Sequence, residues 1–269
     1  MLIKREERNF IFSPLYKMEV KNMAGKLFVI DGVDGSGKNT QAKELYYYFL
    51  QEGYCADEEV TMVSFPRYGQ FSAKFVEMYL HGELSKNAMD MDPYTASLFY
   101  AIDRSISFKT EKWGEVYRNG GIVIADRYFT SNIIHQGAKI LANSFGVDKF
   151  REYINWLKDL ELNKIGIPKP DKIFWLVTDA AANAEMMKTR VENDANHVTD
   201  IHEADTEYLN WCRSAIQTYK QYCHLEYDKY IHFGKRDIYI NTRDENNNLR
   251  SIININSEII QNINDYLHL

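Results

Sequence analysis

Cysteine is scarce in the 269-residue chain, which contains Cys55, Cys212 and Cys223. Their number is odd and their spacing is wide, which fits neither a disulfide framework nor a zinc site, so we expect a reducing compartment, the cytoplasm. Uninterrupted apolar runs are also lacking. A transmembrane helix needs about 18 or more consecutive apolar residues, so we expect no membrane span.

Positive charge is not in excess either, because 32 Lys and Arg residues face 38 Asp and Glu residues and give a net charge of −6. This balance argues against a general affinity for nucleic acid or for an anionic membrane. An acidic chain that binds a polyanionic ligand has to gather its positive charge in one cleft. The hydrophobic fraction of 45% is large enough for a sizeable core.

The N-terminal residues, 1–25, mix Arg, Lys and Glu and have no apolar segment of the kind found in signal peptides. We therefore expect an N-terminal extension over 1–25 without fixed structure, or a protein that begins at Met18 or Met23. The rest of the chain, 26–269, is expected to form a single domain.

Apolar runs typical of buried strands alternate with helical stretches along this domain. The expected strands are 26–31, 60–65, 122–126, 172–177 and 237–241, and the expected helices are 40–53, 92–121 (as one long helix), 129–142, 148–160, 180–190, 204–224 and 250–267. This alternation predicts an α/β fold, with a five-stranded parallel sheet and helices on both faces. An irregular polar insert is expected at 191–203.

The segment FVIDGVDGSGKNTQAKEL, residues 28–45, contains the pattern G-x-x-x-x-G-K of a phosphate-binding loop. Its glycines let backbone N–H groups approach phosphate oxygens, and the helix that follows adds the positive end of its dipole. Lys38 supplies a cation for the β- and γ-phosphates. The expected ATP-binding residues are Gly32, Val33, Asp34, Gly35, Ser36, Gly37, Lys38, Asn39 and Thr40.

Asn39 stands where such loops normally carry a Ser or Thr that holds Mg²⁺. Its amide oxygen can ligate the metal or orient a metal-bound water, and Thr40 can hydrogen-bond a phosphate. The pattern thus predicts phosphate binding and leaves open how the metal is held.

Two classes of phosphate-loop protein fit poorly. A GTPase needs the guanine-reading motif N-K-x-D, but Asn163-Lys164 continues with Ile165-Gly166. A remodelling ATPase is normally a larger chain with paired acidic residues after a strand, whereas Asp126 is followed by Arg127.

Five motifs in one order, FVIDGVDGSGKNTQ, SFPRYG, LFYAIDR, IVIADRYFTSNIIHQGAK and IPKPDKIFWLV, resemble those of thymidylate kinases from about residue 26 to about 215. That family transfers the γ-phosphate of ATP to dTMP. The resemblance implies a three-layer P-loop NTPase fold with a small lid insert at about 188–204. It also implies Mg²⁺ with ATP as the phosphate donor, and a homodimer packed through helices.

The resemblance also implies roles for single residues. Asp126 would hold Mg²⁺ through water, and Arg127 would contact the acceptor phosphate and act in catalysis together with Lys38. Arg67, after Phe65, would grip the dTMP phosphate. Asp34 would meet the deoxyribose 3′-hydroxyl or its neighbouring arginine. The other expected contacts to dTMP are Tyr100 stacked on thymine, Arg104 hydrogen-bonded to the base, and Ser131, Asn132 and Gln136 around the base. His135 would lie beside the 2′ position, where family members often carry Tyr or Phe. We expect the four cations Lys38, Arg67, Arg104 and Arg127 to converge.

The resemblance weakens at the lid. Some members carry an arginine in the phosphate loop where this chain has Gly35, and others rely on basic lid residues. The fixed cations here are Lys188 and Arg190, among many acidic residues, and Arg190 is the candidate catalytic residue. A solvated loop with balanced charge is the alternative interpretation. For the whole chain, the alternatives are a kinase for another deoxynucleotide or deoxynucleoside, and a catalytically weak nucleotide-binding module.

Overall fold

The computed structural model describes residues 25–87, 89–143, 146–193, 206–227 and 236–268, and for 189–193 and 223–227 the description covers the backbone alone. Apart from Gly25, the expected N-terminal extension lies outside these residues and stays a prediction. Among the described residues, no helix has both the length and the apolar character needed to cross a membrane.

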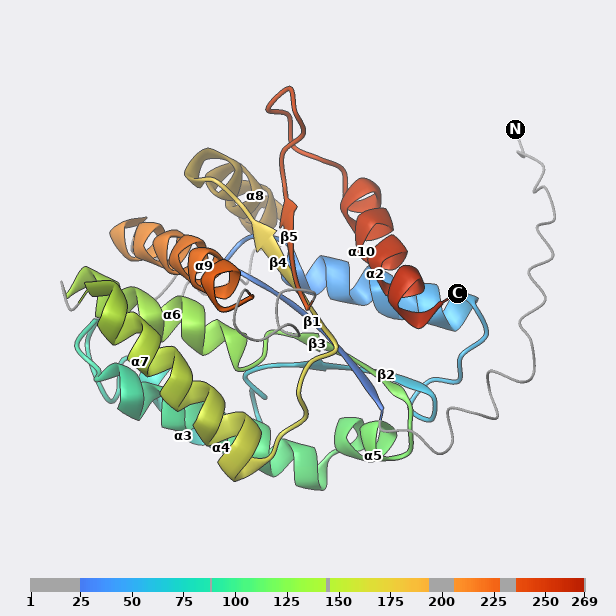
Figure 1. Cartoon of the computed structure of the whole chain (residues 1–269), viewed down its shortest axis with the longest axis horizontal. Helices are drawn as coiled ribbons and strands as arrows, with labels where there is room; N and C mark the ends of the chain where they lie inside the picture. The colour runs from blue at the N-terminus through green and yellow to red at the C-terminus, as the bar shows by residue number, and fades with distance from the viewer. Residues whose placement is uncertain (1–24, 88, 144–145, 194–205, 228–235, 269) are drawn as a thin grey trace.

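The elements alternate between strands and helices along the chain (Figure 1). In chain order they are β1 (Lys26–Gly32), α2 (Lys38–Gln51), β2 (Val60–Ser64), the 3-10 turn η2 (Phe71–Ala73), α3 (Lys74–Leu80), α4 (Pro93–Thr110), α5 (Lys112–Arg118), β3 (Ile122–Asp126), α6 (Thr130–Ala142), α7 (Gly146–Lys158), the π-helical segment η3 (Asp159–Ile165), β4 (Lys172–Val177), α8 (Ala180–Asn193), α9 (Thr206–Tyr227), β5 (Asp237–Asn241) and α10 (Ile252–Leu267).

The five strands form one parallel sheet in the order β2-β3-β1-β4-β5. This confirms the predicted α/β fold, and each strand lies within one residue of the expected range. The register pairs Ile30 of β1 and Ser64 of β2 with Asp126 of β3. The carboxyl ends of these three strands therefore meet at one edge of the sheet, where the phosphate loop begins.

Helices cover both faces of the sheet (Figure 1). Because side chains alternate along a strand, Phe28 and Ile30 of β1 pack in the apolar layer under α2 and α10. Leu27 and Val29 belong to the opposite layer, together with residues of α6, α7 and α9. Both layers are fully buried at β1, so the phosphate loop leaves the sheet from a fixed position.

The prediction of one long helix over 92–121 is wrong, because the chain forms two helices, α4 and α5. The expected start is present, since the Asp92 side chain accepts a hydrogen bond from the N–H of Thr95 at 2.8 Å. Glu111, however, is extended, with φ −108° and ψ 166°, and separates the two helices. Gly114 then packs so tightly that a Cβ would lie 1.8 Å from the carbonyl oxygen of Phe108, so α5 folds back against the end of α4.

Other boundaries also differ from the expectations. The segment between β2 and α4 contains η2 and α3, and α7 continues into the π-helical η3, which ends at Gly166 with φ 79°. Residues 191–193, expected to begin an irregular insert, are the last residues of α8. The remainder of the expected lid, 194–204, lies outside the described residues.

Candidate active site

The phosphate loop connects the end of β1 to the start of α2. Gly37 is the N-cap of α2 in a left-handed conformation, with φ 86°, and no side chain caps the helix. The first N–H groups of a helix have no partner within the helix and form a natural anion site. The loop is therefore built to receive a phosphate at the start of α2.

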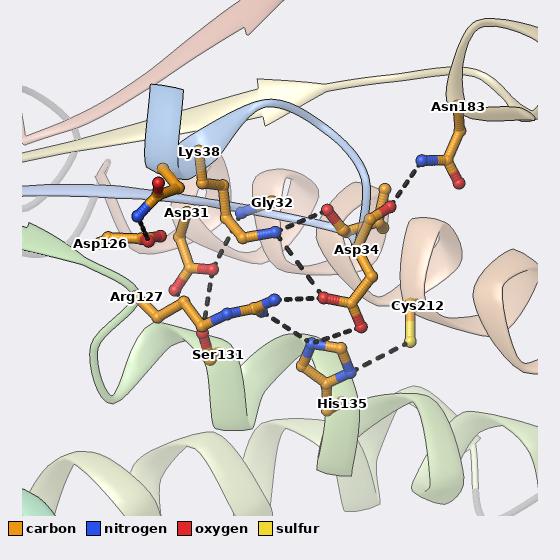
Figure 2. A network of polar contacts seen from close by, with 12 residues as sticks. Asp31, Gly32, Asp34, Lys38, Asp126, Arg127, Ser131, His135, Asn183 and Cys212 are labelled. Carbon is orange, nitrogen blue, oxygen red and sulfur yellow. Dashed lines mark hydrogen bonds and ion pairs between the residues drawn. The ribbon is translucent and has the colours of Figure 1, made fainter. Parts of the chain in front are cut away.

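One carboxylate, Asp34, lies at the centre of a group that we call the Asp34 cluster: Asp34, Lys38, Arg127 and His135 (Figure 2). The Lys38 Nζ lies 3.8 Å from Asp34 Oδ1, and Arg127 Nη2 donates a hydrogen bond to the same oxygen. The His135 Nε2 lies 3.9 Å from Asp34 Oδ2 and 3.4 Å from Arg127 Nη1. The Lys38 Nζ also donates to the Val33 carbonyl at 2.7 Å.

The charges of this cluster compensate one another. Burial alone would raise the pKa of Asp34, but Arg127, His135 and Lys38 together outweigh it and hold that pKa well below its usual range. Burial and the nearby Arg127 guanidinium lower the pKa of Lys38 to about 8, although Asp34 and other carboxylates oppose the change. The cluster thus presents positive charge to a ligand while keeping an internal counter-ion.

Arg127 reaches the cluster through an unusual backbone conformation. It follows β3 directly, its N–H donates to the carbonyl of Ile30 at 3.0 Å, and its φ is 68°. A non-glycine residue in the left-handed region costs about 1–2 kcal/mol, and such strain is concentrated at functional sites. This turn brings the guanidinium from the end of β3 to the carboxylate of Asp34.

Asp126 has the features of a metal-binding carboxylate. Its Oδ2 accepts hydrogen bonds from Asn39 Nδ2 at 2.9 Å and Ser64 Oγ at 3.3 Å. Its Oδ1 is buried and has no hydrogen-bond partner among the described residues. Within the same residues, no group of three or more His, Cys, Asp and Glu side chains could hold a metal ion. A buried carboxylate oxygen without a partner in the described part of the chain fits Mg²⁺, which usually keeps several waters and takes one or two carboxylates.

Asp31 is a site residue that the sequence analysis did not identify. Its fully buried carboxylate accepts hydrogen bonds from Thr130 Oγ1 at 2.5 Å and Ser131 Oγ at 2.9 Å, and from the N–H of Gly32 at 2.9 Å. Burial raises its pKa above the usual value. Ser131, which we expected beside thymine, therefore joins the start of α6 to the phosphate loop in this structure.

The guanidinium of Arg67 lies outside the Asp34 cluster. Its Nη2 forms an ion pair with Glu111 Oε2 at 2.6 Å, in a pocket of about 360 Å³ that includes Thr61, Gln70 and Trp113. The Arg67 Nε is buried and unpaired within the described part of the chain. The extended residue that separates α4 from α5 is thus also the partner of this arginine.

Arg104 is buried and paired as well. Its Nε and Nη2 each donate to the Glu161 carboxylate at 2.6 Å, and its Nη1 donates to the Tyr128 carbonyl at 3.3 Å. Asn132 lies 3.4 Å from the same carboxylate. A guanidinium has five N–H groups, so these contacts leave two for a ligand. Of the four cations that we expected to converge, Lys38 and Arg127 meet at Asp34, whereas a carboxylate outside the cluster holds each of the other two.

The remaining residues expected to contact dTMP are two aromatic side chains, Tyr100 and Phe65, and the amide of Gln136. Tyr100 is partly exposed and packs against the small apolar cluster of α3 and α4, whereas Phe65 is a core residue in edge contact with Trp113. Gln136 is fully buried, and both polar atoms of its amide have no partner among the described residues. Buried polar groups are normally satisfied, so the Gln136 amide is available to a ligand.

The other expected site residues lie at the phosphate loop and on α8. Thr40 is half-buried in the first turn of α2, and the Ser36 hydroxyl is buried without a partner within the described chain. Lys188 is exposed on α8. Arg190 belongs to α8 by its backbone, but its side chain lies outside the description, so its catalytic role stays a prediction.

Comparisons with known proteins identify one family. A family model described as thymidylate kinase matches residues 30–220. Thymidylate kinase of Mycobacterium tuberculosis is 31% identical over 182 residues, 67% of this chain and 79% of the relative, and that of Homo sapiens is 28% identical over 174 residues, 64% and 71% of the two chains. The solved structure of thymidylate kinase from Candida albicans matches with a TM-score of 0.62 at 19% identity, covering 91% of this chain and 94% of the other. The chain belongs to the thymidylate kinase family.

Proposed function

We propose that the protein transfers the γ-phosphate of ATP to dTMP and releases dTDP and ADP. The Asp34 cluster is the observation that carries this proposal, because it gathers Lys38 and Arg127 at the edge of the sheet where ligands of α/β proteins bind. Family membership supports the choice of acceptor. Phosphoryl transfer needs mainly positioning and charge stabilisation, and both are available here.

On the donor side, the N–H groups of the phosphate loop and Lys38 hold the β- and γ-phosphates. Arg127 lies across the cluster from the loop, so it can bridge donor and acceptor and offset charge as the phosphoryl group moves. Mg²⁺, when bound, neutralises charge on the phosphates. Asp126 would hold it through water, and Asn39 supports that carboxylate by its 2.9 Å hydrogen bond.

On the acceptor side, the unpartnered amide of Gln136 and the two remaining N–H groups of Arg104 supply donors and an acceptor for a base edge. Tyr100 lies one helical turn before Arg104 and is partly exposed, as stacking on a base requires. The Nη2 of Arg67 pairs with Glu111, so contact of that nitrogen with the acceptor phosphate requires the ion pair to break.

The decisive experiment is a panel of nucleoside monophosphates with MgATP, followed by a coupled assay of ADP release. We expect turnover that depends on dTMP and falls steeply with dCMP, dAMP and dGMP. Preference for another deoxynucleotide, or for thymidine itself, would replace the proposed acceptor. Tight ATP binding without acceptor-dependent turnover would mean a nucleotide-binding module.

We further propose a homodimer, for which α4 and the segment before it offer a surface. Phe71, Phe75, Leu98 and Ile102 are exposed by 92%, 52%, 41% and 42%, and exposed apolar side chains that gather in this way mark interaction sites. Light scattering after size exclusion should give twice the chain mass, and Ile102→Glu should lower it. We also propose that the protein is cytoplasmic.

A further inference from the structure

A chain of hydrogen bonds reaches the phosphate loop from outside the Asp34 cluster. The Nδ2 of Asn183, on α8, donates to the backbone carbonyl of Asp34 at 2.5 Å (Figure 2). The Oδ1 of Asn183 accepts from Arg213 Nη2, on α9, at 2.7 Å. Asn183 is 1% exposed, so its contact with the Asp34 carbonyl is shielded from water, whereas the contact with Arg213 is partly buried.

The first of these contacts fixes the direction of one peptide group in the loop. In a trans peptide the C=O and N–H point in opposite directions. Since the Asp34 carbonyl points to Asn183 on α8, the N–H of Gly35 points away from α8, and it has no hydrogen-bond partner among the described residues. Gly35 has φ 75°, and a glycine lets such a peptide rotate at little steric cost. The hydrogen bond from Asn183 is therefore a restraint on this orientation that comes from outside the loop.

The second contact fixes the orientation of the Asn183 amide itself. A guanidinium has donors and no acceptor, so the amide oxygen has to face Arg213 and the NH₂ group has to face the Asp34 carbonyl. Arg213 is held in turn, because its Nε donates to the Thr178 carbonyl at 3.2 Å and its Nη1 donates to Asn210 Oδ1 at 2.8 Å. Thr178 directly follows β4, so the chain of contacts begins at the sheet.

We propose that Asn183 and Arg213 are positioning residues for the phosphate donor. Asn183 holds the 34–35 peptide so that the Gly35 N–H is directed to the phosphates of the nucleotide, and Arg213 keeps the Asn183 amide in the orientation that this requires. The inference rests on the proposed function, in that the phosphate loop binds ATP. Neither residue touches the reacting atoms.

The informative variant is Asn183→Asp, which keeps the shape of the side chain. A carboxylate pairs with Arg213 at least as well as the amide does, but it has no donor for the Asp34 carbonyl. A role limited to packing α8 against α9 predicts no loss of function. The positioning role predicts that the KM for ATP rises about tenfold or more, with an unchanged KM for dTMP.

The test combines kinetics with calorimetric binding of MgADP, so that it remains readable if dTMP proves not to be the acceptor. Arg213→Met should weaken MgADP binding too, and its effect should not add to that of Asn183→Asp, because both act through one amide. Asn210→Ala is the matched control, since it removes a contact of the same guanidinium that does not lead to the loop, and it should bind MgADP as the natural protein does. Unchanged MgADP affinity in Asn183→Asp, or an equal loss of dTMP and MgADP affinity, would overturn the proposal.

Discussion

The pair of Arg104 and Glu161 gives the sharpest prediction about stability. Both side chains are almost completely buried, at 1% and 0% exposure, and two hydrogen bonds of 2.6 Å join them. Replacing Glu161 by Ala leaves a guanidinium buried without its counter-ion. Breaking a buried pair in this way costs about 3–5 kcal/mol. For a chain of this size each kcal/mol lowers the Tm by roughly 2–4 °C, so we expect a fall of about 6–20 °C.

The assay is thermal and urea unfolding of the ligand-free protein, followed by circular dichroism. A second variant separates the loss of an ion pair from the loss of packing. Arg104→Met combined with Glu161→Leu removes both charges and should be more stable than either single variant, because no unpaired charge remains. A loss below about 1 kcal/mol for Glu161→Ala, or a double variant as unstable as the sum of the singles, would refute the reasoning.

Three further predictions concern the phosphate loop. The pKa of Lys38 is about 8, so its positive charge is present below that pH and is lost above it. The affinity for MgADP, measured by calorimetry, should therefore fall as the pH rises from 7 to 9, and an affinity that does not change with pH would contradict this. Asn39→Ala removes a donor to Asp126 and should raise the Mg²⁺ concentration for half-maximal rate about tenfold. An unchanged Mg²⁺ concentration for half-maximal rate would count against the proposed metal site. Gly35→Ala places a Cβ 2.4 Å from Met187 Cγ at a φ of 75°, so both the Tm and the MgADP affinity should drop. If neither changes, α8 moves to make room for the Cβ and the reasoning is wrong.

The sheet and the phosphate loop could be predicted because their signals are local. Each strand is a short apolar run, and the pattern from Gly32 to Lys38 carries its own geometry. The break at Glu111 could not be predicted in the same way, since no proline or glycine occupies that position and the apolar pattern continues across it. It depends on the close approach of Gly114 to the carbonyl of Phe108, which is a tertiary contact.

The site was predictable where one element supplies the geometry and unpredictable where two distant elements meet. Lys38 and Arg127 follow strands that share an edge of the sheet, so their meeting at Asp34 could be expected. The partner of Arg104, Glu161, lies 57 residues away in a π-helical segment without a sequence signature. Asn183 likewise reaches the loop from 149 residues away, and an isolated asparagine in a helix gives no signal of such a contact.

The carboxylate of Asp34 affects which anions bind at Lys38 and Arg127. Two buried cationic groups without a counter-ion would bind chloride or another small anion. Here an ion that carries a single charge must displace a pairing already made, so it gains little by entering. A chain of phosphates carries enough negative charge to pair with both cations at once. The Asp34 cluster therefore favours polyphosphates over ions that carry a single charge.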